Sequence, residues 1–289
     1  EETYKALEAS KAWSKAEMIA PKQFREEISP YFNANPKKYI SALVSEDCWQ
    51  ATPGKVVDLV RNLGIAAGGT VMEDCRVLEA CREGKYTSVL VQTHDKKYVE
   101  YRTEHFVNAL GSGAGKLCDS MGIDAGLYPV RHQAFITRRL PMLGKHGTNL
   151  DMLIDRQDYK GFSAVYGQQI AYTGQIIGCA SPKLDAMRID KNLKVNTKAF
   201  LEIVSEMFSE WIPDLAGVGI QAVWAGYYTE PRYIVDPELG LFVGMRGHGF
   251  MLSQYIARMY VDKLLGRPVP GYFEKLKLNG PGLSEKAFK

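Results

Sequence analysis

The stretch GMRGHGFMLSQY, residues 244–255, holds the densest group of residues that could bind a ligand. Three glycines surround one arginine and one histidine, and a helical pattern follows: Gly244, Arg246, Gly247, His248 and Gly249. Ordered glycines cost backbone entropy, so glycines this close together indicate that the backbone approaches another group closely. The start of the following helix adds unpaired N–H groups and a partial positive charge. The stretch therefore predicts a site for a ligand with electron-rich oxygens.

A second glycine-rich stretch, GSGAGK at residues 111–116, does not fit the common nucleotide-binding fingerprints. A P-loop has four residues between its glycines and a Ser or Thr after its lysine, but here three residues separate Gly111 from Gly115, and Leu117 follows the lysine. The G-x-G-x-x-G fingerprint also fails. What remains is a turn from a strand to a helix. Its N–H groups would face an anion, and a plain turn is an equally good interpretation.

Other kinds of site receive no support from the sequence. The five histidines lack metal-ligand spacing, the five cysteines contain no CxxC pair, and G-x-S-x-G is absent. We therefore expect no metal site and no Ser or Cys nucleophile. Trp224, Tyr227 and Tyr228 flank Gly226, and on their own they fit a half-buried strand.

Composition limits the partners and the location. The 36 basic and 33 acidic residues are spread along the chain and leave a net charge of +3, which argues against a nucleic-acid partner. The longest apolar runs are much shorter than the roughly 20 residues of a membrane span. The N-terminus lacks the anatomy of a signal peptide, and the cysteine usage fits reduced thiols. We expect a cytoplasmic protein with no membrane span.

The elements that must position these residues follow from the hydrophobic pattern. A helix begins at Thr52 and Pro53 and stops at Gly68 and Gly69. Apolar stripes predict further helices over residues 3–19, 196–215 and 251–266. Predicted strands cover residues 70–80, a hairpin around a turn at 94–97, residues 105–110, at least four antiparallel strands between 127 and 180, and residues 219–229.

The order of these features resembles a known family. A helix ending in AAGGTV, a hairpin and FVNALGSGAGKL come before a sheet that begins near PVRHQAFIT, and then WAGYYT, DPELGLFVGMRGHGFMLS and a last helix follow. This order, from Thr3 to Leu265, resembles the FAD-dependent oxidoreductases of the D-amino-acid oxidase family, which includes glycine oxidase, sarcosine oxidase and dye-linked proline dehydrogenase. The resemblance implies an α/β (α+β mixed) fold in which an incomplete Rossmann-like FAD-binding half accompanies an antiparallel-sheet substrate domain.

The resemblance also implies a division of the chain. Residues 1–50 would be a helical segment, and residues 51–125 would form part of the FAD-binding domain. The substrate domain would cover 126–222. Residues 223–268 would return to the FAD-binding domain with the glycine loop and the C-terminal helix, and 269–289 would be a tail.

By the same resemblance the cofactor is FAD. The C-terminal loop would lie against the flavin, where its backbone N–H groups would stabilise negative charge on the reduced ring. Ala109, Leu110 and Gly111 would line the diphosphate and ribityl region, and Val77 would meet the adenine side through its backbone. The implied flavin-side residues are Gly226, Arg246, Gly247, His248, Gly249, Phe250 and Met251.

The implied activity is oxidation of a small amine or amino acid, similar to sarcosine, proline or glycine, by hydride transfer to flavin N5. Tyr227, Tyr228 and His248 would lie near the substrate. The sequence departs from the family where amino-acid oxidases place an arginine, since Tyr227 and Tyr228 stand there, and where sarcosine oxidases place a lysine, since Met251 stands there. A substrate carboxylate would then need another cation, with Arg131, Arg232 and Arg246 as candidates; a less acidic amine would need none.

The G-x-G-x-x-G segment with which such proteins begin is missing, so we expect either a truncated chain or a second chain that supplies this segment. Two alternatives stay open. A flavin-linked 2-hydroxy-acid dehydrogenase would use His248 or His132 as its base. A structural or assembly subunit would keep the fold without its cofactor.

Overall fold

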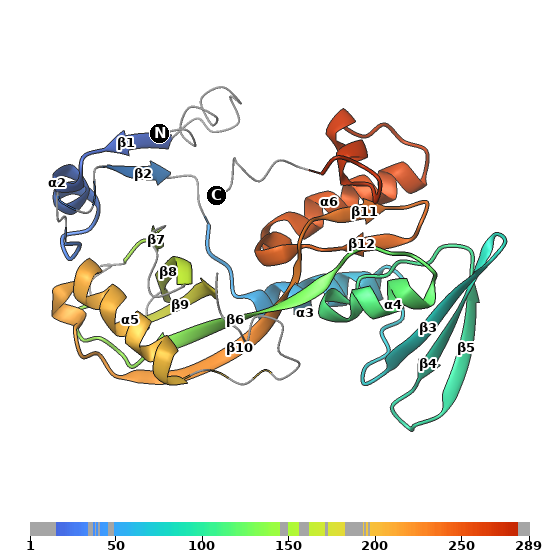
Figure 1. Ribbon diagram of the computed structural model, residues 1–289, viewed down its shortest axis with the longest axis horizontal. Coiled ribbons are helices and arrows are strands. Elements are labelled where there is room, and N and C mark those ends of the chain that lie inside the picture. Colours follow the sequence, from blue (N-terminus) through green and yellow to red (C-terminus); the bar gives the residue numbers. More distant parts are fainter. Residues whose placement is uncertain are drawn as a thin grey trace. The chain divides into compact units, whose positions relative to one another are not determined.

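The computed structural model describes residues 16–33, 37, 39, 41–45, 49–144, 150–155, 162–170, 173–182, 193, 195 and 197–282 (Figure 1). The chain divides into two compact units. Unit 1 comprises Glu1–Cys48, Val130–Tyr227 and Lys286–Lys289, and unit 2 comprises Trp49–Pro129 and Tyr228–Glu285. Each unit is therefore assembled from segments that are distant in the sequence.

A five-stranded sheet forms the centre of unit 1, with the strand order β10-β6-β9-β8-β7. The pairs β6–β9, β9–β8 and β8–β7 are antiparallel, which confirms the predicted antiparallel sheet. The strands are β6 (Tyr128–Thr137), β7 (Leu153–Asp155), β8 (Phe162–Ile170), β9 (Gln175–Pro182) and β10 (Ile220–Glu230).

Helix α5 (Thr197–Trp211) lies across one face of this sheet (Figure 1). Its predicted apolar stripe is buried, and Phe208 meets Phe135 of β6 edge-to-face with ring centroids 5.6 Å apart. The indole N–H of Trp211 donates to the Asp155 carboxylate over 2.9 Å, and so the end of the helix is fixed to β7. The apolar stripe that the sequence predicts for this helix thus forms part of the core of unit 1.

The predicted helix over residues 3–19 is wrong for its last four residues. Ala16–Ile19 forms β1, which pairs antiparallel with β2 (Ala42–Ser45). Pro21 disfavours helical geometry at the preceding residue, and Ala20 is extended with φ −68° and ψ 149°. A short helical stretch then follows in α2 (Pro21–Gln23) and the π-helical η1 (Phe24–Ile28). Residues 3–15 of the predicted helix lie outside the described residues.

A three-stranded antiparallel meander opens unit 2: β3 (Arg76–Glu83), β4 (Tyr86–Gln92) and β5 (Tyr98–Thr103). Side chains of β4 alternate between buried and partly buried, and α4 (Ala114–Ser120) packs its Leu117 into the same cluster as Ala80, Val89 and Val91. The hairpin is as predicted. The predicted strand over 105–110 is wrong, since only Asn108 forms a bridge there, parallel to Leu241.

The second part of unit 2 combines β11 (Ile234–Asp236), β12 (Leu241–Val243), the 3-10 turns η4 (Arg246–His248) and η5 (Gly271–Leu276), and α6 (Gly249–Leu264). Phe273 and Leu276 are fully buried against Tyr260 and Met259 of α6. The described part of the segment after α6 therefore packs back on the unit.

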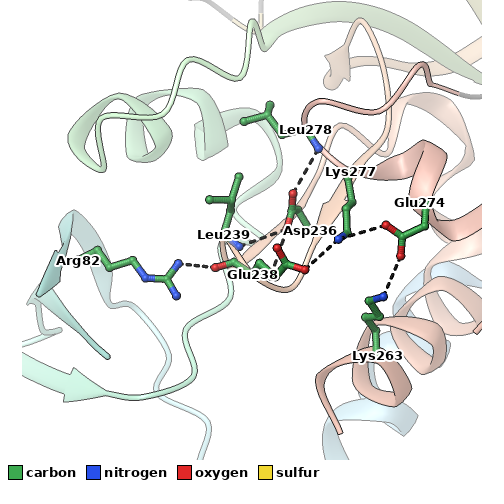
Figure 2. Close-up of polar contacts among 8 residues, drawn as sticks. All are labelled: Arg82, Asp236, Glu238, Leu239, Lys263, Glu274, Lys277 and Leu278. Carbon is green, nitrogen blue, oxygen red and sulfur yellow. Dashed lines mark hydrogen bonds and ion pairs between the residues drawn. The ribbon is translucent and has the colours of Figure 1, made fainter. Parts of the chain in front are cut away.

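A polar network holds this segment in place (Figure 2). The buried Asp236 carboxylate accepts the backbone N–H groups of Glu238 and Leu239, at 3.1 and 3.3 Å, and that of Leu278 at 3.4 Å. Lys277 pairs with the Glu238 carboxylate over 2.9 Å, and Arg82 of β3 donates to the Glu238 carbonyl. The turn after β11 is thereby connected to both the meander and the C-terminal segment.

Helix α3 (Pro53–Ala66) also forms as predicted, and it ends where the Gly69 N–H donates to the Gly64 carbonyl. Its apolar side chains remain in solvent. Leu59 and Leu63 are 58% and 60% exposed, and no residue of the helix is buried. An apolar stripe normally stabilises a helix by packing against neighbouring elements. The apolar face of α3 is instead exposed to solvent.

Candidate functional site

Asn108 joins the two glycine-rich stretches within unit 2. Its backbone pairs with β12, because its N–H donates to Gly240 over 2.8 Å and its carbonyl accepts from Phe242 over 3.0 Å. Its fully buried side chain donates to the Ala114 carbonyl over 3.1 Å and accepts the Leu110 N–H over 3.3 Å. One amide therefore fixes the turn at 109–113 beside the strand that leads into the loop at 244–249.

The glycines of that loop are required by neighbouring protein atoms. Gly244 has φ +72°, and a Cβ there would overlap the carbonyl oxygen of Arg232. A Cβ on Gly247 would stand 2.7 Å from the Tyr228 ring. A Cβ on Gly249 would stand 2.9 Å from the Cβ of Met245. The loop therefore packs closely on the end of β10 and the residues after it.

An ion pair fixes the middle of the loop. Arg246 Nε donates to a carboxylate oxygen of Glu230, the last residue of β10, over 2.6 Å, and both side chains are largely buried. Arg246 also has the left-handed φ of +50°, which is uncommon for a residue other than glycine. The pair supplies the contact that holds this strained position.

The His248 imidazole contacts a buried tyrosine. The Tyr233 hydroxyl lies 2.7 Å from His248 Nδ1, and the two rings are tilted by 44°. Burial and the nearby Arg246 charge lower the pKa of His248 below its ordinary value of 6.5. Burial also raises the pKa of Tyr233. His248 is therefore neutral near pH 7, beside a protonated phenol.

The predicted substrate-side tyrosines do not share a face. Because side chains alternate along a strand, Tyr227 and Tyr228 of β10 point to opposite sides of the sheet, and Gly226 shares a side with Tyr228. The Tyr228 ring lies against the loop residue Gly247. The two tyrosines thus cannot act together on one face of the strand.

The other predicted cofactor residues lie on the surface or at its edge. Ala109, Leu110 and Gly111 are exposed on the turn held by Asn108. Phe250 and Met251 are exposed in the first turn of α6, Met251 to 67%. Val77 is partly buried and packs against the cluster under the meander.

The candidate cations for a carboxylate are engaged or buried within the protein. Arg232 donates to the carbonyls of Leu278 and Gly280, and Arg246 pairs with Glu230. Arg131 is completely buried on β6 in unit 1, next to the buried His132. Arg232 and Arg246 therefore serve the packing of unit 2.

Within the described part of the chain, no three His, Cys, Asp or Glu side chains come together as a metal site. The search for a helix both long and apolar enough to cross a bilayer, made over the same residues, finds none. The described cysteines are free thiols, and burial raises the pKa of Cys179 to about 11. Such a thiol is protonated at neutral pH.

Comparison with known proteins identifies the class. The sequence model of the family described as FAD dependent oxidoreductase matches residues 1–263, and the chain belongs to that family of enzymes. No curated protein sequence matches the chain. FAD is the cofactor of the family, as the resemblance implied.

Solved structures share the fold. L-proline dehydrogenase from P. horikoshii is 24% identical with a TM-score of 0.74, and the match covers 91% of this chain and 68% of that one. Glycine oxidase from Bacillus cereus is 16% identical with a TM-score of 0.69, covering 94% and 72%. Iminodiacetate oxidase from Chelativorans is 13% identical with a TM-score of 0.69, covering 97% and 71%. The mixed α/β fold with antiparallel sheets is thereby confirmed.

The residues of unit 2 fit the flavin part of FAD. The first turn of α6 contains no acidic residue and has no side-chain cap, so its N–H groups suit an electron-rich oxygen. A Cβ on Gly111 would meet nothing within 4 Å, which leaves room beside the turn for a ligand.

Sequence reasoning missed three residues that build this site: Asn108, Glu230 and Tyr233. Asn108 had a usable signal, since an asparagine directly before a glycine-rich turn commonly bonds to backbone groups. Glu230 and Tyr233 had none, because their partners lie 15 or 16 residues further along the chain.

Proposed function

We propose that the protein oxidises a small amine or amino acid, similar to sarcosine, proline or glycine, at the carbon next to the nitrogen. FAD supplies the hydride acceptor, flavin N5. The similar structures support this substrate class, since their names state a proline dehydrogenase, a glycine oxidase and an iminodiacetate oxidase. The single observation that carries the proposal is the closely packed loop at 244–249, which presents His248 and the start of α6.

The chain's own contribution is orientation and electrostatics. The first-turn N–H groups of α6, from Gly249 to Met251, would stabilise negative charge on the reduced ring. Gly247 and His248 would hold the same end of the cofactor, and Tyr228 supports them from β10. No protein base is needed when the amine binds unprotonated, so the enzyme need only align the C–H bond and exclude water.

The arginines of unit 2 bear on whether the substrate carries a carboxylate. Arg232 and Arg246 already donate to backbone carbonyls and to Glu230, which leaves fewer of their N–H groups for a substrate carboxylate. A less acidic amine would require no cation. Both belong to the proposed class, and a substrate panel separates them.

We also propose that the G-x-G-x-x-G segment that binds the FAD diphosphate lies outside these 289 residues, either in the same polypeptide or in a second chain. The sequence contains no such fingerprint. The matched structures extend beyond this chain, which covers 68–72% of them. The exposed apolar face of α3 offers a surface for that segment. We place the assembly in the cytoplasm, in keeping with the free thiols.

The test begins with protein purified from its native source. We expect the flavin absorption bands, together with either a second chain or a mass greater than that of these 289 residues. Without oxygen, sarcosine, proline or glycine should bleach the visible flavin band, while 2-hydroxy acids should not. Bleaching by hydroxy acids alone would replace the proposal with the dehydrogenase alternative. A colourless chain that takes up no FAD would contradict the cofactor assignment.

A further inference from the structure

We propose that Tyr233 is a positioning residue that holds His248 in the tautomer with its proton on Nε2, so that the imidazole is a hydrogen-bond donor and not a base. The tautomer is a property of the chain itself. Its role in oxidation rests on the function proposed above.

The hydrogen-bond partners of the two groups decide whether the Tyr233 hydroxyl or His248 Nδ1 is the donor. The only partner of the Tyr233 hydroxyl among the described residues is His248 Nδ1, at 2.7 Å. If Nδ1–H donated to the phenol oxygen, the phenol hydrogen would have no acceptor among these residues. Tyr233 is only 8% exposed, and a buried donor without an acceptor is costly, whereas an unused lone pair on oxygen costs little. The phenol therefore donates to Nδ1.

The surroundings of the ring keep it neutral. Burial disfavours the charged form of the ring, and the Arg246 charge, two residues before His248, adds to this. Tyr233 is the titratable group bonded to the ring, and it stays protonated because burial raises its pKa. A neutral imidazole whose Nδ1 accepts a hydrogen bond must carry its own hydrogen on Nε2.

This tautomer has a consequence for the reaction class. A ring with Nε2 protonated and Nδ1 already bonded has no nitrogen free to remove a proton from a hydroxyl group. His248 is then unsuited as the base of a 2-hydroxy-acid dehydrogenase. As an N–H donor beside the start of α6, it adds to the groups that stabilise negative charge.

The tautomer can be measured directly. The full chain, in its native assembly and with 15N-labelled histidine, gives long-range 1H–15N correlations that distinguish Nδ1 from Nε2 protonation. The His248→Gln variant assigns the signals among the five histidines. We expect His248 to be neutral and protonated on Nε2 at neutral pH. Protonation on Nδ1 in the wild-type protein would overturn the proposal without need of a further variant.

Two phenylalanine variants test the role of the hydroxyl. Tyr233→Phe removes it and keeps the ring, so the His248 nitrogen shifts should move toward a mixture of tautomers. Tyr255→Phe is the matched control, because it removes a hydroxyl on α6 that, among the described residues, bonds only Tyr272, over 2.8 Å. Unchanged His248 shifts in Tyr233→Phe would also overturn the proposal.

Kinetics separate this inference from the proposed function. Tyr233→Phe should slow flavin reduction by the amine about tenfold with little change in KM. The variant keeps the His248 imidazole but no longer holds its N–H donor in place. Tyr255→Phe should react like the wild type. If no amine reduces the flavin while the Nε2 tautomer is found, the proposed function fails and the tautomer stands. If amines react at wild-type rates in Tyr233→Phe, the positioning role fails and the function stands.

Discussion

Gly244 is confined by the protein backbone at the beginning of the loop. A side chain there would combine a φ of +72° with overlap of the Arg232 carbonyl, and backbone cannot move aside as a flexible side chain can. We expect Gly244→Ala to lower the free energy of unfolding by about 3 kcal/mol. Urea denaturation followed by circular dichroism measures this loss.

The matched control is Gly126→Ala, also in unit 2. Gly126 has a φ of +60°, but a Cβ there would meet nothing within 4 Å, so only the backbone strain applies. This variant should lose about 1 kcal/mol. Equal losses at the two positions would show that the contact with Arg232 does not constrain the loop.

His248 makes stability depend on pH in a defined direction. Its folded-state pKa lies below the ordinary value of 6.5, so the unfolded chain takes up a proton first as the pH falls. Stability from this group is therefore complete above about pH 6.5, and it decreases until the pH passes below the folded pKa. In His248→Gln the free energy of unfolding should vary less over this window.

The measurement is the difference between wild-type and His248→Gln unfolding free energies as a function of pH, since subtraction cancels the titration of other groups. Wild-type stability should fall relative to the variant on the acid side. A difference that stays constant, or a wild-type protein that gains stability in acid, would mean that the folded imidazole is not kept neutral.

At the scale of elements, Asn108 holds the turn before α4 to β12. Asn108→Ala removes one donor and one acceptor from a fully buried site and should cost about 2–3 kcal/mol. Asn108→Asp is nearly isosteric but places a carboxylate oxygen against the Ala114 carbonyl. It should cost more than the alanine variant. Thermal or urea unfolding of both variants gives the order, and an aspartate variant that is the more stable of the two would contradict this role.

The same turn shows what local sequence can and cannot predict. Helices α3 and α5 were predictable because their stripes recur within one segment. The strand expected over 105–110 fails because only Asn108 pairs there, and its partner Leu241 lies far along the chain. Likewise β1 exists through its pairing with β2, which the helical pattern of 3–19 does not reveal.

The candidate site also combines a feature that the sequence marks with contacts that the sequence does not reveal. Glycines mark the loop at 244–249 in the sequence, and the structure places Gly244 and Gly247 against Arg232 and Tyr228 of the chain itself. Those contacts depend on how β10 ends beside the loop, and no local pattern encodes that arrangement. Contact of each predicted residue with FAD stays a prediction.

At the scale of the whole molecule, the unpartnered face of α3 raises the question of what covers it. Val56, Leu59, Val60 and Leu63 form a stripe at helical spacing, while Ile65 lies on the opposite side of the helix. Both sides are exposed, Leu63 to 60% and Ile65 to 45%. If the segment that carries the G-x-G-x-x-G fingerprint docks on the stripe, only substitutions on that side should affect FAD binding.

We therefore expect the double variant Leu59→Gln, Leu63→Gln to change the free energy of unfolding of this chain by no more than about 0.5 kcal/mol, since neither side chain is buried in it. In the protein purified from its native source the same variant should lose most of its FAD, together with the second chain where the fingerprint segment is a separate chain, because apolar anchors at an interface carry much of the affinity. Ile65→Gln, an equal change of polarity on the opposite side, should retain both.

Flavin absorbance per mole of chain and native mass measure the outcome. FAD content that is unchanged in the double variant would show that the stripe is not the docking surface. A large loss of stability in the isolated chain would show instead that the stripe packs within unit 2.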